Sequence, residues 1–75
     1  MLFRSNDINI YIASNKLQIN VPEEAEMSLY SLCGKKLLAS ALGKGANVMH
    51  VDLEHNIYII RLRFAEDVKT FKLIN

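Results

Sequence analysis

The stretch EHNIYIIRLRF, residues 54–64, carries the strongest β-strand pattern in the chain. Four large, mainly apolar side chains share one face of an extended strand: Tyr58, Ile60, Leu62 and Phe64. The opposite face is apolar at its start and cationic at its end: Ile57, Ile59, Arg61 and Arg63. We therefore expect a central strand whose inner face, Tyr58 included, is buried in the core. Ile57 and Ile59 would then need cover from a partner or from a parent protein.

The same alternation of apolar and polar residues recurs along the chain. Turn residues interrupt it at intervals of about 8–12 positions, which is typical of β-sandwiches and barrels. Seven segments are candidate strands: 8–13, 16–21, 26–32, 35–42, 47–53, 57–64 and 68–74. Pro22 ends the second of them, because proline has no N–H to donate to a strand ladder. The sequence predicts an all-β fold, a small seven-stranded immunoglobulin-like antiparallel β-sandwich that forms a single domain over residues 1–75.

Segment 35–42, KKLLASAL, is open to a second interpretation. It would also form two turns of helix with an apolar face, and leucine and alanine favour helices. Lys35 and Lys36 would then lie at the positive N-terminal end of that helix, which is unfavourable. Eight residues are also few for a helix without strong packing. We expect a strand here, because pairing with neighbouring strands overrides intrinsic propensity.

Charge and composition argue against several classes of function. Nine Lys and Arg against eight Asp and Glu give a net charge of +1, without the basic footprint of a nucleic-acid-binding protein. No segment approaches the roughly 18 apolar residues of a membrane span. The start, MLFRSNDINI, lacks the apolar run of a signal peptide, so we expect any export signal in a longer precursor. Cys33 is the only cysteine, which excludes an intrachain disulfide.

Three arrangements could carry chemistry, and each has a simpler explanation. Cys33 with His50 or His55 would supply a nucleophile and a base, but nothing around Cys33 suggests an oxyanion hole. His50, Asp52 and His55 could bind zinc, although their spacing matches no closed zinc motif. The segment GKGAN, residues 43–47, lacks the full phosphate-loop pattern. We expect no catalytic, metal or cofactor site, and no enzymatic activity.

Three segments carry a resemblance to a known family. AEMSLYSLCGKKLL, residues 25–38, contains a Tyr-x-x-x-Gly-Lys element formed by Tyr30, Gly34 and Lys35. LEHNIYIIRL, residues 53–62, contains an Ile-Tyr pair in a strand that ends on arginine and leucine, and VKTFKLIN, residues 68–75, is a closing strand with two lysines. Together they resemble the C-terminal sorting domain of cargo proteins of the type IX (Por) secretion system of Bacteroidota. The resemblance covers about residues 8–75.

The sequence departs from the family pattern at two places. The family commonly has a Pro-Asn-Pro stretch after its first strand, where this chain reads YIASNK, residues 11–16. The glycine that precedes the Ile-Tyr pair in the family is Asn56 here. Asparagine is the non-glycine residue that best tolerates the left-handed conformation, so we expect Asn56 to adopt it and to retain the turn.

The resemblance implies a seven-stranded sandwich at the end of a longer exported protein, covalently attached to an upstream cargo domain. In the family, the outer-membrane secretion machinery recognises this domain while the protein is in transit through the periplasm. A sortase-like protease then typically removes it, and the cargo is attached to lipopolysaccharide at the cell surface or released. Carried over to matching positions, the partner-recognition residues would be Gly34, Lys35, Asn56, Tyr58, Lys69 and Lys72. None of them would be catalytic.

An alternative interpretation is an immunoglobulin-like accessory or adhesion module that mediates protein–protein contact. The missing Pro-Asn-Pro stretch favours it, and so do Ile57 and Ile59, which could form an exposed apolar patch. A free edge strand could also add to the sheet of another chain. This interpretation allows self-association as a homodimer.

Overall fold

A computed structural model describes residues 8–75, which form seven antiparallel strands. The strands are β1 (Asn9–Ala13), β2 (Lys16–Val21), β3 (Ala25–Ser31), β4 (Lys36–Leu42), β5 (Gly45–His50), β6 (Ile57–Arg63) and β7 (Val68–Ile74). The part of the chain from residue 8 to residue 75 contains no helix, and hence none long and apolar enough to cross a membrane. The predicted all-β sandwich of seven antiparallel strands is confirmed, and segment 35–42 contributes strand β4 as expected.

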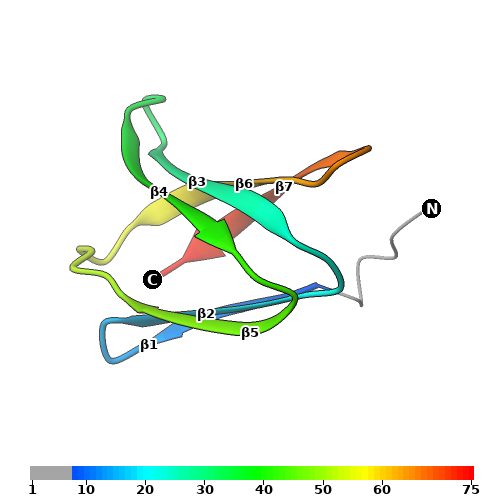
Figure 1. Ribbon diagram of the computed structural model, residues 1–75. Helices are drawn as coiled ribbons and strands as arrows, with labels where there is room; N and C mark the ends of the chain where they lie inside the picture. Colours follow the sequence, from blue (N-terminus) through cyan, green and yellow to red (C-terminus); the bar gives the residue numbers. More distant parts are fainter. Residues whose placement is uncertain (1–7) are drawn as a thin grey trace.

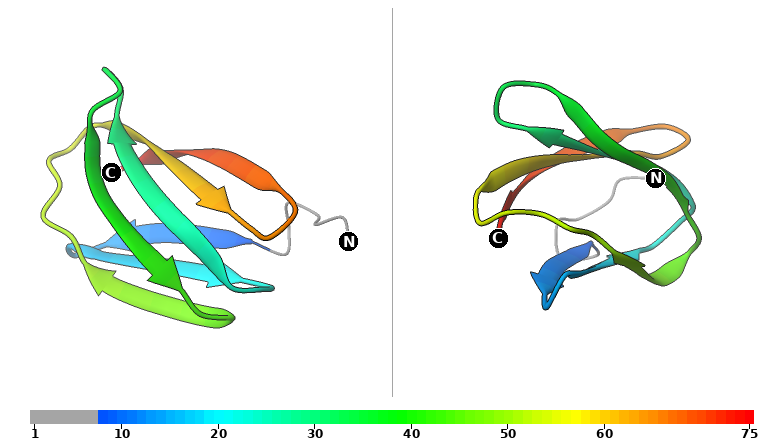
Figure 2. Two further views of the ribbon diagram at one scale, coloured as in Figure 1. Left: turned by 45° about the horizontal axis from the view of Figure 1, so that its top comes forward. Right: turned by 90° about the vertical axis from the view of Figure 1, so that its left-hand side faces the viewer.

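The strands form two sheets that pack face to face. One sheet has the order β1-β2-β5 and the other the order β4-β3-β6-β7 (Figure 1). Figure 2 shows the two sheets as separate layers. In an immunoglobulin domain of the constant type the fourth strand pairs with the fifth. Here β4 pairs with β3 instead, so the chain changes sheets between β4 and β5.

The turns are fixed by residues suited to them. Ser14 and Asn15 join β1 to β2 with φ of 52° and 61°, the two positive values of a type I′ hairpin turn. The change of sheet after β4 is held by Asn47. Its Oδ1 accepts a hydrogen bond from the Gly43 N–H at 3.1 Å, and its Nδ2 donates to the Gly43 carbonyl at 2.8 Å. One side chain therefore satisfies both backbone groups of Gly43 at the crossing point.

The core lies between the sheets and is centred on β6. Tyr58, Ile60, Leu62 and Phe64 are at most 6% exposed, which confirms the predicted inner face. Leu17 and Ile19 of β2 and Met27 and Leu29 of β3 are among the other buried residues. Ile57 and Ile59 on the outer face are half-buried, because cross-strand neighbours cover part of each side chain. No buried side-chain polar atom within residues 8–75 lacks a hydrogen-bond partner.

The strand expected over residues 47–53 ends earlier than predicted, at His50. The N–H of Val51 donates to the carbonyl of Asn15 at 2.9 Å, and the chain then leaves the sheet to cross to β6. The connection 51–56 passes over one end of the sandwich (Figure 1). This connection positions the candidate site.

Candidate functional site

Strand pairing brings most of the predicted recognition residues to one end of the four-stranded sheet. Ser31, the last residue of β3, pairs with Tyr58, and Ile74 at the end of β7 pairs with Ile57. The β5–β6 connection and the C-terminus therefore lie together at this end of the sheet, and the β3–β4 turn projects beyond the same end, as Figure 1 shows. We call this region the corner; it comprises residues 31–35, 53–58 and 74–75.

The β3–β4 turn is built around Gly34. Its N–H donates to the Ser31 carbonyl at 3.0 Å, and its φ of +92° disfavours any residue with a Cβ. The Ser31 N–H donates to the Lys35 carbonyl at 2.9 Å, and the Ser31 hydroxyl oxygen accepts from the Lys35 N–H at 3.2 Å. The Lys35 side chain is exposed. Gly34 thus shapes the turn, and Lys35 is accessible on it.

Cys33 is exposed in the same turn, with its Sγ 3.0 Å from the Ser31 Oγ. This contact with the Ser31 hydroxyl, followed by the backbone N–H of Lys35, holds the pKa of the Cys33 thiol below its ordinary value. His55 lies on the β5–β6 connection, where its Nδ1 is 3.3 Å from the carbonyl oxygen of Asn75. The hydrogen-bond partners of this cysteine and this histidine are thus a serine and a backbone carbonyl.

Asn56 does not adopt the expected conformation. The positive φ values among residues 8–75 belong to Ser14, Asn15, Gly34 and Gly45, so the prediction of a left-handed Asn56 is wrong. The reason is local hydrogen bonding. The Asn56 Oδ1 accepts from the Ile57 N–H at 2.8 Å, and the Asn56 carbonyl accepts from the Asn75 N–H at 3.0 Å. The turn is formed by these bonds and requires no left-handed residue.

Tyr58 is a structural residue of the corner. It is 6% exposed, and its hydroxyl donates to the Glu54 carbonyl at 2.9 Å. A tyrosine near the start of the sixth strand that bonds back to the preceding connection is the tyrosine corner of immunoglobulin-type sandwiches. Any recognition through Tyr58 would therefore act through the shape of the corner.

Asn75 ties the end of the described chain to the same connection. Its Nδ2 donates to the carbonyl of Leu53 at 2.9 Å and to that of Glu54 at 3.2 Å. The Glu54 carbonyl thus accepts from both Tyr58 and Asn75. No local sequence pattern predicts this role of Asn75, because its partners lie 21 and 22 positions away in the chain.

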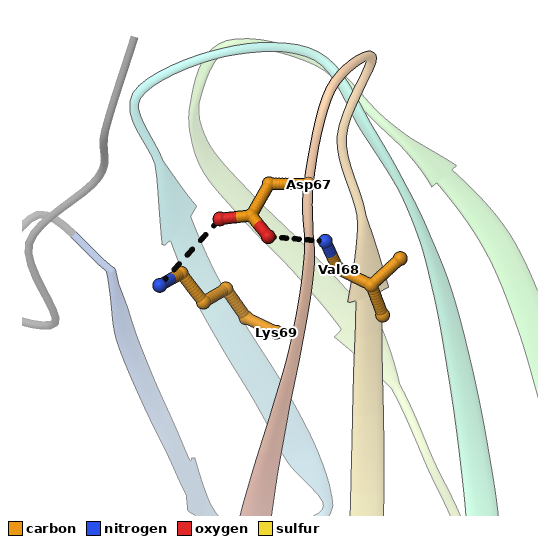
Figure 3. Close-up of polar contacts among 3 residues, drawn as sticks. All are labelled: Asp67, Val68 and Lys69. Carbon is orange, nitrogen blue, oxygen red and sulfur yellow. Dashed lines mark hydrogen bonds and ion pairs between the residues drawn. The ribbon is translucent and has the colours of Figure 1, made fainter.

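The two lysines of β7 do not belong to one site. Lys69 pairs across the ladder with Leu62, near the β6–β7 turn at the far end of the sheet. Its Nζ lies 3.5 Å from the Asp67 Oδ2, while the Asp67 Oδ1 accepts from the Val68 N–H at 2.8 Å (Figure 3). Lys72 is exposed on the outer face beside Ile59. Three residues of strand place the two Cα atoms about 10 Å apart, with side chains on opposite faces.

A groove of about 570 Å³ opens beside the corner. Its apolar lining includes Leu29, Leu38, Leu53 and Tyr58, and its polar lining includes Asp52, Glu54 and Asn56. Such a surface suits a partner that presents an apolar side chain next to a positive charge. Within residues 8–75, no three His, Cys, Asp or Glu side chains gather closely enough to hold a metal ion.

No protein-family model matches the sequence, and a comparison with curated proteins gives no significant match.

Proposed function

We propose that this domain is a non-catalytic C-terminal sorting signal, which directs an exported cargo protein through the outer membrane to the cell surface by the type IX secretion system. One observation carries the proposal. The Tyr-x-x-x-Gly-Lys element and the Ile-Tyr element, two of the three segments that carry the resemblance, are neighbours in space because Ser31 pairs with Tyr58. Two motifs separated in sequence thus contribute to one corner.

The geometry divides the resembling residues into two groups. Gly34 shapes the corner through its positive φ, and Tyr58 through a partly buried hydrogen bond from its hydroxyl. Lys35, Asn56 and Lys72 are exposed at or near it and available to a partner. In this proposal the secretion machinery reads the exposed residues, and the sandwich holds them in place. The domain itself carries out no reaction.

The proposal is tested by a secretion assay. Residues 1–75 are fused to the C-terminus of a fluorescent reporter that carries an ordinary export signal and folds in the periplasm. The fusion is expressed in a bacterium that has the type IX machinery, and the reporter is measured in the periplasm, at the surface and in the medium. We expect it at the surface or in the medium in wild-type cells, and in the periplasm of cells that lack the outer-membrane translocon.

Point variants separate recognition from folding. Deleting β7 would remove the buried Leu73 and unfold the domain, so the exposed lysines are better targets. We expect the double substitution Lys35→Gln and Lys72→Gln to reduce secretion. The matched control, Lys16→Gln with Lys44→Gln, removes the same charge from exposed positions outside the corner and should leave secretion unchanged. Periplasmic retention of the folded wild-type fusion would refute the sorting function.

A second candidate function, a protein-contact or adhesion module, is favoured by a different observation. Ile74 is 70% exposed and pairs with the half-buried Ile57 on the outer face of the four-stranded sheet. Association of two copies through this face would cover both side chains. Light scattering tests it, since a stable dimer that Ile74→Lys dissociates would support the module, whereas a monomer at all concentrations would count against self-association.

A further inference from the structure

The outer face of the four-stranded sheet is positively charged. Its outward positions form rows across the strands, such as Lys36–Tyr30–Ile59–Lys72 and Ala39–Ser28–Arg61–Thr70. Of the residues that the structure describes, four cations lie on this face: Lys36, Arg61, Arg63 and Lys72. Among residues 8–75, Glu26 is the only carboxylate at the outward positions of this sheet, and it pairs with Arg63 at 3.1 Å. Within residues 8–75, Lys36, Arg61 and Lys72 have no carboxylate within salt-bridge distance.

A hollow lies in the middle of this face. It has a volume of about 150 Å³ and is lined by Glu26, Ser28, Tyr30, Lys36, Arg61 and Arg63. Three cations and two hydroxyl groups therefore border a space large enough for one small anionic group. Glu26, the single carboxylate in the lining, forms an ion pair with Arg63. The side chains of Arg61 and Lys36 are therefore the positive charges of the hollow that a bound anion could pair with.

We propose that this face binds an extended acidic peptide segment, with one carboxylate seated in the hollow against Arg61. A guanidinium presents a planar fork of N–H donors that matches a carboxylate in two parallel hydrogen bonds. Ser28 and Tyr30 supply hydroxyl donors on the neighbouring strand. This inference does not depend on the secretion role, because it concerns the middle of the sheet and not the corner.

The surroundings of the hollow favour a peptide over a nucleic acid. Ile59 lies next to Tyr30 in the same row, so the surface beside the cations is apolar and aromatic. An extended peptide that alternates acidic and apolar residues would place successive side chains of one kind about 7 Å apart. A nucleic acid would need a broader basic footprint than a chain of net charge +1 offers.

The test uses the 75-residue chain labelled with ¹⁵N and a capped peptide of four Glu-Val repeats. Two-dimensional amide spectra are recorded as the peptide is added at low salt. We expect saturable shifts centred on Ser28, Tyr30 and Arg61. The same peptide with glutamine in place of glutamate should produce none, and added salt should weaken the binding.

Two variants with a matched control locate the site. Arg61 is exposed, so Arg61→Gln should fold normally, and the same spectra report this directly. We expect it to weaken binding about threefold to tenfold, the range for losing a partly exposed charge-assisted bond. Lys36→Gln should act in the same direction. Lys44→Gln removes the same charge from the β4–β5 turn and should leave the affinity unchanged.

Three results would overturn the proposal. The first is equal binding of the glutamine peptide, and the second is an equal loss of affinity in Lys44→Gln and Arg61→Gln. The third is inorganic phosphate alone producing the same shifts at equal or lower concentration than the peptide. That result would make the hollow a small-anion site and not a peptide-binding surface.

Discussion

The two faces of strand β6 share one backbone but differ in what determines them. On the inner face, Ile60 and Leu62 have no exposed surface, and Tyr58 and Phe64 are nearly as buried. On the outer face, Ile57 and Ile59 are half-buried, and Arg61 and Arg63 are exposed. The inner face is fixed by the need to remove large apolar side chains from water. The outer face is only partly removed from water, so burial constrains its residues much less.

This difference indicates where the fold is encoded and where function can vary. Each fully buried side chain of the inner face contributes roughly 1.5–3 kcal/mol, so most changes there would unfold a domain this small. The outer face contributes little to folding, and its residues can serve a partner. Both the corner and the cationic hollow include outer-face residues of the four-stranded sheet.

The largest expected effect is that of Leu62→Ala on the inner face. Leu62 has no exposed surface, so truncation removes buried apolar atoms and leaves a cavity between the sheets. We expect the free energy of unfolding to fall by about 2–5 kcal/mol. Urea denaturation followed by circular dichroism measures it. A loss under about 1 kcal/mol would show that this face does not form the core, since that is less than the transfer of one leucine.

A smaller effect is expected for Tyr58→Phe, which keeps the ring on the inner face and removes only its hydroxyl. The Glu54 carbonyl would retain the Asn75 Nδ2 as a donor, so this acceptor would keep a hydrogen-bond partner. We expect a loss of about 0.5–1.5 kcal/mol, the net value of one hydrogen bond. The same denaturation experiment checks it. A change indistinguishable from zero would mean that the hydroxyl bond does not stabilise the corner.

The contrast between the faces also explains which features the sequence could predict. Alternation along β2 and β6 predicts their buried residues, because hydrophobic burial leaves a local period-two pattern. The pairing of β4 with β3 leaves no such pattern, so it could not be predicted from the sequence. The hydrogen bonds of Asn75 to residues 53, 54 and 56 depend on how distant segments meet, which also explains the wrong prediction for Asn56. Local sequence thus predicted the strands and their buried faces, while the corner depends on tertiary contacts.

On the outer face, Ile59→Thr tests how little that surface contributes to folding. Threonine keeps the β-branched shape that strands favour and removes part of a half-buried apolar surface. We expect the free energy of unfolding to fall by only about 0.5–1 kcal/mol. The measurement is repeated at two protein concentrations tenfold apart. A larger loss that depends on concentration would show that a second copy covers this face, because association stabilises by mass action.

The smallest expected effect is the coupling between Arg63 and Glu26, which pair across the outer face at 3.1 Å. Their side chains are 64% and 67% exposed, so water and salt screen the pair. A double-mutant cycle with Arg63→Gln and Glu26→Gln should give a coupling energy of about 0.2–1 kcal/mol at low salt, decreasing as salt is added.

The control is a second cycle that combines Arg61→Gln with Glu26→Gln. Arg61 does not pair with Glu26, so this cycle should give a coupling energy near zero. A coupling that is large and insensitive to salt would place the pair in a shielded environment. The outer face would then be a covered surface like the inner one, and the distinction between the two faces of β6 would fail.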